Sequence, residues 1–351
     1  MKRVTLFVAS MGAGGAQRVI SIMSKYLADR GYEVSLVTFY DRKPAYDIDS
    51  RVSQYCLEKE VNGNQILKKY RWFRSFIRNH CDVLVSFLAV YNMFAILAGL
   101  HTHKKIIVAD RNDPRFVPEN RLMRFARDYF YKFADKIVVQ TTDNRLYFSK
   151  KIQNKSKVIF NPVDLGEKQK LALRTDKANR IVSAGRLTAQ KNQLMLIQAF
   201  QEFSEEFPDY TLTIYGEGPD RQKLELYIND NGLSEKVFLP GNINNLFDEI
   251  SNAKLFVLSS NYEGMPNALI EAMCLGLPCV STRVSGASDI IEDGKSGTLI
   301  DVGDTMQLAT AMKNIIREDE LQKTYAQNAV ALNDGLKADI IMEKWMRLFD
   351  A

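Results

Sequence analysis

The sequence predicts an α/β protein with two doubly wound domains, and three observations lead to this prediction. The chain has 351 residues, more than one ordinary hydrophobic core accommodates. Short β-branched runs alternate with longer segments of helical periodicity, as in βαβ units with parallel sheets. This alternation stops in a polar stretch at residues 163–179 and then resumes, which indicates a linker between two domains.

The first half begins with an apolar run, residues 4–9, that we interpret as a first strand. The run is too short for the apolar core of a signal peptide, and a glycine loop follows it where a cleavage site would be expected. Apolar residues then recur at helical spacing from Ala16 to Leu27, and Gly31 stands where a helix end favours a left-handed residue. Further strands are predicted at 33–39, 82–87, 105–109, 136–140 and 157–160. This half is predicted to form a Rossmann-like domain.

The second half repeats the pattern. Strands are predicted at 180–184, 211–215, 236–239, 254–258 and 278–281, separated by helices such as 193–206 and 267–275. Two such domains would face each other across a cleft lined by the carboxyl ends of their strands, where open α/β sheets bind ligands. We expect domains at 1–163 and 164–335, with a final helix in 336–351 that packs back on the first domain.

Composition excludes several classes of function. The net charge of +5 is modest and fits an anionic partner such as a nucleotide diphosphate or a membrane surface. No zinc-finger, helix-turn-helix or aromatic–basic module is present, so nucleic acid is not an expected partner. The sequence has no apolar tract long enough to span a bilayer. Cys56, Cys81, Cys274 and Cys279 lack CxxC or disulfide-like spacing, which predicts a reducing, cytoplasmic environment.

The most specific segment is YEGMPNALIEAM, residues 262–273, which lies between an apolar strand and a helix. Glu263 and Glu271 are separated by seven residues, and Gly264 and Pro266 set a tight turn that opens the helix of Glu271. The first four N–H groups of a helix lack intrahelical partners, and the helix dipole adds about half a positive charge there. Such a helix start binds anions, so the segment predicts a site for the phosphates of a nucleotide sugar. The alternative is two surface glutamates that flank an ordinary turn.

The segment SAGRLTAQKN places Arg186 and Lys191 after a strand and before a helix. Breaking a glycosyl–phosphate bond places negative charge on the departing diphosphate, and two cations directed at it stabilise that charge. They also make a metal ion unnecessary, so no metal or cofactor is predicted. The alternative is a solvated surface pair.

Together these motifs resemble glycosyltransferase family 4, whose signature is an acid, seven residues and a second acid in the second domain of a GT-B fold. The resemblance spans nearly the whole chain and implies two Rossmann-like domains facing across a cleft. It implies that Glu271 binds the donor ribose, that Glu263 supports the transferred sugar, and that Arg186 and Lys191 bind the diphosphate. The backbone at four positions would hold the sugar and its phosphates: Gly264, Met265, Pro266 and Asn267.

Two glycine turns fit the same resemblance. GAGGAQR, residues 12–18, has Gln17 at the third glycine position of a dinucleotide fingerprint, so it is a poor match to that motif. In the family a similar turn lies close to the donor, which implies this role for Gly14 and Gly15 because they have no Cβ to block the approach. YGEGP, residues 215–219, matches a family turn near the nucleotide base and adds Gly216 and Gly218 to the predicted site.

The first domain departs from the family, in which many members have a histidine directed toward the donor sugar. His101 and His103 are predicted on the surface, with no acid or cysteine cluster to complete a metal site. The string ADRNDPR follows the 105–109 strand where relatives place an acid and then histidine or arginine, which gives four candidates: Asp110, Arg111, Asn112 and Asp113. Arg111 cannot be a base, so it would act as a cation or hydrogen-bond donor.

The resemblance implies a retaining enzyme that moves a hexose or N-acetylhexosamine from a nucleotide diphosphate sugar, with UDP expected, onto a glycan hydroxyl. The implied acceptor is a polyprenyl-diphosphate-linked glycan of bacterial surface polysaccharide synthesis. Residues 66–78 and 121–136, rich in basic and aromatic residues, predict peripheral contact with an anionic membrane at the inner face of the plasma membrane. In 66–78 the apolar stripe consists of Ile66, Tyr70, Phe73 and Ile77, and Trp72 is the expected interface anchor; the alternative is an ordinary helix on the sheet. Rival hypotheses are a sugar-nucleotide epimerase, a NAD(P)-dependent oxidoreductase and a non-catalytic family member.

Overall fold

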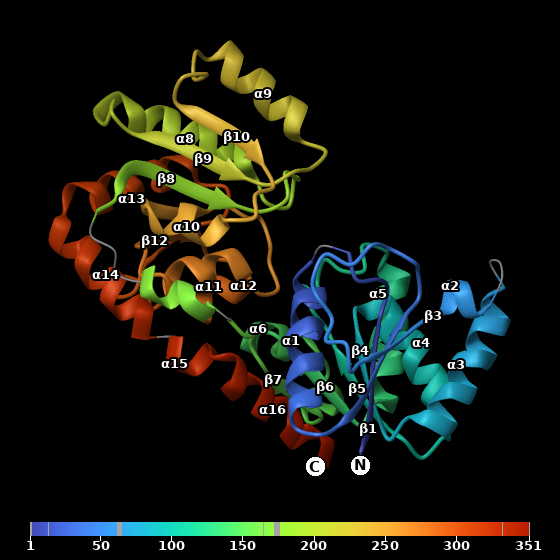
Figure 1. Ribbon diagram of the computed structural model, residues 1–351. Coiled ribbons are helices and arrows are strands. Elements are labelled where there is room, and N and C mark those ends of the chain that lie inside the picture. Colours follow the sequence, from blue (N-terminus) through green and yellow to red (C-terminus); the bar gives the residue numbers. More distant parts are fainter. Residues whose placement is uncertain are drawn as a thin grey trace. The chain divides into compact units, whose positions relative to one another are not determined.

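The computed structural model describes residues 2–12, 14–61, 65–163, 165–171, 176–331 and 333–350. The chain folds into two compact units, coloured blue to green and green to red in Figure 1, with the C-terminal residues belonging to the first. Unit 1 comprises residues 1–162 and 337–351, and unit 2 comprises residues 163–336. Within the predicted linker, residues 164 and 172–175 lie outside the described residues, and Gly166–Leu171 form the 3-10 helix η2.

Unit 1 contains a parallel sheet of seven strands in the order β3-β2-β1-β4-β5-β6-β7. The strands are β1 (Arg3–Val8), β2 (Glu33–Thr38), β3 (Ser53–Cys56), β4 (Val83–Phe87), β5 (Lys105–Ala109), β6 (Lys136–Val139) and β7 (Ser156–Val158). Strand β1 pairs with β2 on one side and β4 on the other, so the strand order reverses between β1 and β4. The carboxyl ends of strands beside such a reversal are where open α/β sheets bind ligands.

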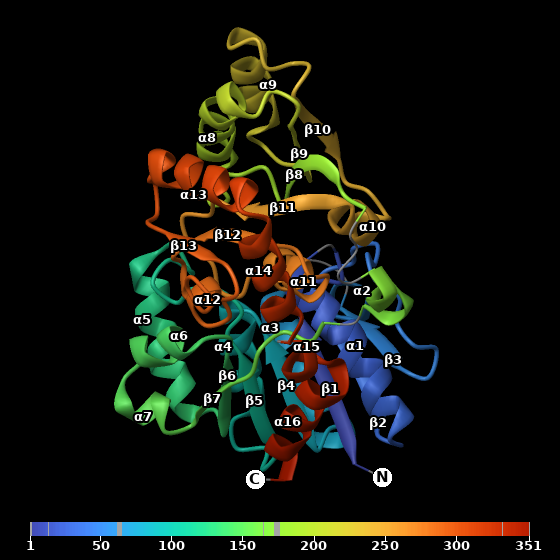
Figure 2. The same ribbon diagram turned by 90° about the vertical axis from the view of Figure 1, so that its left-hand side faces the viewer.

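Helices cover both faces of this sheet. Successive side chains of β1 point to opposite faces, so the strand packs against helices on both sides. Val4 and Leu6 pack in a core that includes Trp345 of the last helix, whereas Phe7 packs with Phe73 on the other face. The last helix, α16, lies beside α1 in both views (Figures 1 and 2). The helical elements of unit 1 are α1 (Gly15–Asp29), α2 (Leu57–Glu60), α3 (Ile66–His80), α4 (Ala89–Gly99), α5 (Arg121–Phe130), η1 (Tyr131–Phe133), α6 (Thr142–Tyr147), α7 (Lys150–Gln153) and α16 (Ala338–Asp350).

Unit 2 repeats this topology with six parallel strands in the order β10-β9-β8-β11-β12-β13. They are β8 (Ala178–Ala184), β9 (Thr211–Tyr215), β10 (Val237–Gly241), β11 (Ala253–Leu258), β12 (Cys279–Thr282) and β13 (Thr298–Ile300). Its helices are α8 (Gln193–Glu206), α9 (Arg221–Asp230), α10 (Leu246–Ser251), α11 (Asn267–Cys274), α12 (Ser285–Ser288), α13 (Thr305–Arg317), α14 (Asp319–Ala331) and α15 (Asn333–Leu336). Here the strand order reverses between β8 and β11.

Helix α3 spans the first segment predicted to contact a membrane. Phe73 and Ile77, half of the predicted apolar stripe, are fully buried against the sheet. Trp72, the predicted interface anchor, stacks on Phe76 with ring centroids 5.2 Å apart. The sheet of unit 1 therefore covers half of this stripe, whereas Ile66 is 53% exposed, and contact of this segment with a membrane stays a prediction. Within the described ranges, none of the helices combines the length and apolar character that a bilayer crossing requires.

Candidate active site

The turn after β8 places the two predicted cations of unit 2. Arg186 is exposed at the start of this turn, and its carbonyl accepts a 2.8 Å hydrogen bond from Gln193 Nε2. Asn192, at the end of the turn, has φ 48°, a left-handed conformation that asparagine tolerates better than most residues. The turn therefore has a fixed backbone from β8 to α8, with the guanidinium of Arg186 on its solvent side.

Lys191 lies in the same turn and contacts the predicted acid Glu263. Its Nζ is 2.5 Å from Glu263 Oε1, and Ser260 Oγ donates to the same oxygen at 2.7 Å. The side chains of Lys191 and Glu263 are 17% and 7% exposed, respectively, so this ion pair is largely removed from solvent. The structure thus brings together two predicted site residues that are 72 positions apart in the sequence.

Hydrogen bonds to backbone carbonyls join the turn after β8 to the turn after β11. Ser259 Oγ donates to the Lys191 carbonyl at 3.0 Å, and the Asn261 amide donates to the Gln190 carbonyl at 2.8 Å. Gln190 Nε2 donates to the Tyr262 carbonyl at 3.0 Å. Because β8 and β11 are neighbours at the strand reversal of unit 2, these turns lie at the edge where ligands bind in this class of sheet.

The predicted phosphate site lies at the start of α11. Pro266 precedes the helix in an extended conformation and provides no side-chain cap, and the first turn of α11 contains no acidic residue. A phosphate there would meet backbone N–H groups and the positive end of the helix dipole. Gly286 lies directly against this turn: a Cβ on it would be 2.6 Å from Pro266 Cδ and 2.9 Å from Met265 Cα.

Glu271, the second acid of the motif, is in α11 and is only 4% exposed. The pKa of the Cys274 thiol is raised to about 12, mainly by burial and further by the charge of Glu271. A buried carboxylate can accept two charge-assisted hydrogen bonds from vicinal hydroxyls, the interaction that a donor ribose needs.

Gly216 and Gly218 lie beside the turn that contains Arg186. A Cβ on Gly216 would clash with Gly185, and one on Gly218 would be 2.7 Å from the backbone nitrogen of Leu187. Gly216 also has φ 138°, which L side chains rarely adopt. Only glycine allows the turns after β8 and β9 to pack backbone to backbone, where the Leu187 amide donates to the Glu217 carbonyl at 3.0 Å.

In unit 1 the predicted glycines begin α1, although Ala13 between them and Gly12 lies outside the described residues. Gln17 folds back over Gly14, where its side chain occupies the space of a Cβ, and its Nε2 donates to the Ser10 carbonyl at 3.1 Å. The residue that replaces the third glycine of a fingerprint therefore braces the turn after β1.

Of the four candidates after β5, Asp110 is part of an internal network. It is 2% exposed, accepts a hydrogen bond from Tyr131 Oη at 3.1 Å, and lies 3.9 Å from Arg127 Nη1. Burial raises the pKa of its carboxyl group. Asp113 accepts a hydrogen bond from the amide of Arg115 at 2.9 Å, and the Asn112 carbonyl accepts one from Asn144 at 3.3 Å.

Arg111 differs from the other three candidates because some of its N–H groups do not donate a hydrogen bond to any described residue. Its Nη2 donates to Asn161 Oδ1, which also accepts a 2.8 Å hydrogen bond from Gln140 Nε2, and the guanidinium lies 6.0 Å from the ring centroid of Phe87. Its Nε and Nη1 are buried without a hydrogen-bond partner in the described structure. Burial lowers the pKa of Arg111 to about 9, so it remains a cation at neutral pH.

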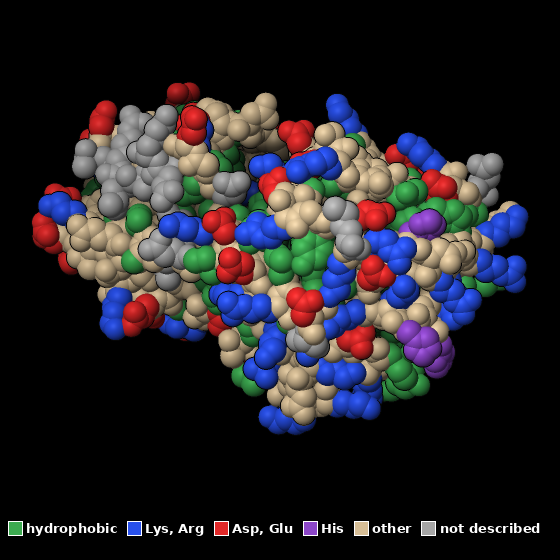
Figure 3. Space-filling view, turned by 60° about the horizontal axis from the view of Figure 1, so that its bottom comes forward, with side chains coloured by type: hydrophobic (Ala, Val, Ile, Leu, Met, Phe, Trp, Pro, Cys, Tyr) green, Lys and Arg blue, Asp and Glu red, His purple; other side chains and the backbone are tan. Residues whose placement is uncertain are grey.

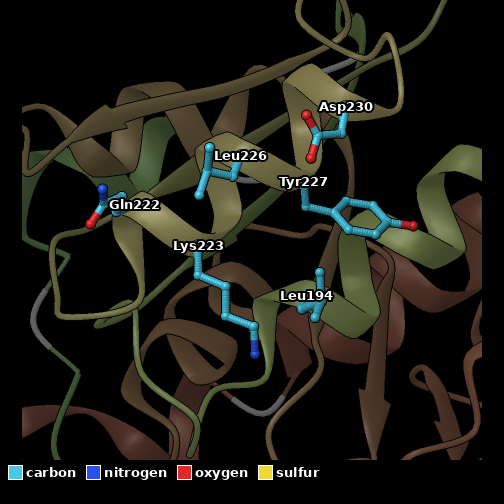
Figure 4. Close-up of a pocket in the computed structure, with 6 residues that line it drawn as sticks. All are labelled: Leu194, Gln222, Lys223, Leu226, Tyr227 and Asp230. Carbon is cyan, nitrogen blue, oxygen red and sulfur yellow. The ribbon is translucent and has the colours of Figure 1, made fainter.

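Several residues at these sites were not predicted from sequence: Gln140, Asn161, Ser260 and Gly286. Ser260 is the second residue after β11, and that position was the signal that could have identified it. His101 and His103 are exposed, and the described residues contain no group of acids, histidines or cysteines that could hold a metal. A pocket of about 480 Å³ between α8 and α9 contains none of the predicted residues (Figure 4). Its lining residues are Leu194, Gln222, Lys223, Leu226, Tyr227 and Asp230.

Comparison with known proteins identifies two family models. Residues 166–331 match the model of glycosyl transferases group 1, and residues 13–167 match that of glycosyltransferase family 4. Together the two matches extend over both units. The chain is 24% identical to a Campylobacter jejuni GalNAc-alpha-(1->4)-GalNAc-alpha-(1->3)-diNAcBac-PP-undecaprenol alpha-1,4-N-acetyl-D-galactosaminyltransferase, over 99% of this chain and 98% of that protein.

Two further comparisons concern a second relative and a solved structure. A C. jejuni N-acetylgalactosamine-N,N'-diacetylbacillosaminyl-diphospho-undecaprenol 4-alpha-N-acetylgalactosaminyltransferase is 28% identical over 94% of each chain. The crystal structure of HepE from Anabaena in complex with UDP superposes with a TM-score of 0.84 and 17% identity over the full length of both chains. At that identity the superposition shows the fold alone.

Proposed function

Because the chain belongs to glycosyltransferase family 4 and has the GT-B type of fold, we propose that it transfers a hexose or N-acetylhexosamine from a UDP sugar to a hydroxyl of a polyprenyl-diphosphate-linked glycan. The observation that supports this most directly is the Lys191–Glu263 ion pair beside the start of α11, at the strand reversal of unit 2. The names of the two C. jejuni relatives include undecaprenol-linked sugars, which supports the acceptor class. The UDP bound to HepE supports the donor base.

The roles that we propose within unit 2 are those that the family resemblance implies for these residues. Lys191 and Arg186 stabilise the charge that develops on the departing diphosphate, and the start of α11 binds its phosphate oxygens. Glu263 orients Lys191 and accepts a hydrogen bond from the transferred sugar, while Glu271 accepts hydrogen bonds from the ribose. Two cations supply the charge stabilisation that a divalent ion would provide, so the proposed reaction needs no metal. Activity unchanged by EDTA is the expected result.

The proposed transfer retains the anomeric configuration by front-face attack. The bond from the anomeric carbon to the diphosphate oxygen breaks, and the acceptor oxygen forms its bond to the same face of that carbon. The acceptor proton passes to the departing diphosphate, so no protein carboxylate is needed as a nucleophile, unlike in a retaining glycosidase. An inverted anomer in the product, identified by NMR, would contradict this part of the proposal.

The proposed enzyme acts at the cytoplasmic face of the plasma membrane as a peripheral protein in bacterial surface polysaccharide synthesis. A polyprenyl tail keeps the acceptor in the bilayer, so the enzyme has to approach the membrane surface.

Nucleotide-dependent thermal stability tests the proposal. A ligand at a hundred times its Kd adds about 2.7 kcal/mol, which corresponds to roughly 5–10 °C for a unit of this size. We expect UDP to raise the melting temperature of the wild type and not of Glu271→Gln, with GDP, ADP, dTDP and NAD as comparisons. Stabilisation by another diphosphate would correct the donor base. Stabilisation only by NAD, or by none of these ligands, would contradict a UDP-sugar transferase.

A further inference from the structure

Helix α5 in unit 1 has an inverted polarity. Its one fully buried side chain is Arg127, at 0% exposure. Three of its large apolar side chains are exposed, Leu122 at 74%, Phe125 at 73% and Tyr129 at 49%, followed by Phe133 at 44% in η1, whereas Phe130 is partly buried against the core. The spacings of three, four and four residues place these side chains on one face.

The buried Arg127 holds α5 in this orientation. Its Nη1 donates to the carbonyls of Pro114 at 3.0 Å and Val117 at 2.7 Å, and its guanidinium lies 5.0 Å from the ring centroid of Phe148. These carbonyls belong to the loop that follows the Arg111 region, so α5 is attached to the candidate site of unit 1. Turning the apolar face inward would bury new apolar surface only by leaving this loop and Arg127 without their hydrogen bonds.

The chemistry of the outward face matches a lipid–water interface. Aromatic and aliphatic side chains form its centre, and basic side chains flank it: Arg121 and Arg124 are at the start of the helix, and Lys132 Nζ lies 5.7 Å from the Tyr129 ring. Basic charge alone does not select a surface, because Figure 3 shows lysine and arginine spread widely over the face that it draws. The exposed apolar stripe distinguishes α5, whereas in α3 the sheet buries Phe73 and Ile77 of the corresponding stripe.

We propose that the outward face of α5, formed by Leu122, Phe125 and Tyr129 with Phe133 of η1, docks on an anionic lipid bilayer. The inference rests on the proposed function, since a polyprenyl-linked acceptor requires an enzyme that reaches the membrane. Docking buries the apolar stripe in the interface and places Arg121, Arg124 and Lys132 among the lipid headgroups. The Arg127 contacts then hold the loop that contains Asp113 at the membrane side of the enzyme.

Vesicle flotation of the full-length protein tests the inference. The double variant Leu122→Ser/Phe125→Ser changes the two most exposed side chains of the face, and Leu67→Ser in α3 (70% exposed) and Leu226→Ser in α9 (56% exposed) are matched controls. Full burial of one such side chain changes partitioning by about tenfold to a hundredfold. We expect wild type and controls to bind vesicles of phosphatidylcholine with phosphatidylglycerol, and the double variant to bind at least about tenfold more weakly.

Three outcomes would overturn the inference: a wild type that does not float, a double variant that floats as well as the wild type, or equal binding to phosphatidylcholine alone. A wild type that is dimeric without vesicles and a double variant that is monomeric would overturn it too, because the face would then pair with a second copy. UDP-dependent stabilisation of the same variants is independent of vesicles. UDP stabilisation without vesicle binding therefore refutes only this inference, whereas vesicle binding without nucleotide stabilisation refutes only the proposed transferase.

Discussion

Replacing Lys191 by alanine tests whether its ammonium group stabilises the leaving diphosphate. The group lies 2.5 Å from Glu263 Oε1, and Glu263 is in the turn that precedes α11, the helix whose start we propose as the phosphate site. Removing one directed donor of the oxyanion-hole type costs about 2.7–4 kcal/mol of transition-state stabilisation, or about 10²–10³ in turnover. We expect kcat of Lys191→Ala to fall by about that factor.

The same substitution leaves Glu263 without its ammonium partner, so stability has to be measured as well. Breaking a buried ion pair by removing one partner costs about 3–5 kcal/mol. The cost here should lie at or below the lower end, because Lys191 is 17% exposed and Ser260 still donates to Glu263 Oε1 at 2.7 Å. In Lys191→Met/Glu263→Gln no uncompensated charge remains, so we expect its melting temperature to return close to that of the wild type while turnover stays low.

The assay is release of the proposed product UDP during transfer, run below the melting temperature of every variant and accompanied by thermal unfolding curves. A folded Lys191→Ala enzyme with wild-type turnover would refute the leaving-group role. If the double variant recovers both stability and turnover, the ion pair is structural and the catalytic assignment fails. Lys191→Arg keeps the charge and changes only its geometry, so it should lose less turnover than Lys191→Ala.

Two further predictions concern a support of the site and the buried cation of unit 1. Gly286→Ala adds a methyl group 2.6 Å from Pro266 Cδ and should displace the turn before α11, which lowers kcat by about tenfold to a hundredfold. Gly335→Ala is the control, because, apart from the local helix backbone, no atom of the described residues lies within 4 Å of the added methyl group, so its kcat should not fall. Steady-state kinetics of both variants tests this prediction. Arg111→Met removes two buried donors without partners, so its melting temperature at pH 7 should rise by about 2–4 °C for each 1 kcal/mol regained while transfer falls. The pKa of Arg111 in the folded protein, about 9, is below its value in the unfolded chain. The gain in stability of Arg111→Met over the wild type should therefore be full below pH 9 and shrink above it. A variant with a lower melting temperature than the wild type would contradict the reasoning.

The central strands were predictable because burial on both faces makes them continuous apolar runs. Lys105–Ala109 and Thr211–Tyr215 have the bounds that the sequence predicts, and so does the helix Gln193–Glu206. The edge strands were not predictable in the same way. Two of the four residues of Ser53–Cys56 are exposed, and Thr298–Ile300 has only three residues, so neither shows an apolar run or a clear alternation.

The residue types of the candidate site could be predicted, but their contacts could not. Lys191 and Glu263 meet only because β8 and β11 are neighbours at the strand reversal, which depends on the topology of the whole unit. Gly286 lies outside every motif, and its importance comes from the backbone of Met265 and Pro266 passing beside it. Ser260 is only three residues from Glu263, but the conformation of their shared turn, which directs the hydroxyl at the carboxylate, is not visible in the sequence.

Helical periodicity shows that a segment is amphipathic without showing which face is buried. In α3 the sheet buries the apolar face, including Phe73. In α5 the interior instead holds Arg127, and Phe125 remains exposed. The difference arises in the irregular loop after β5, whose carbonyls at Pro114 and Val117 have no strand partner and need donors. A loop packed beneath α5 thus selects the side of the helix that bears Arg127 for the interior, and that requirement is not visible in the sequence of the helix itself.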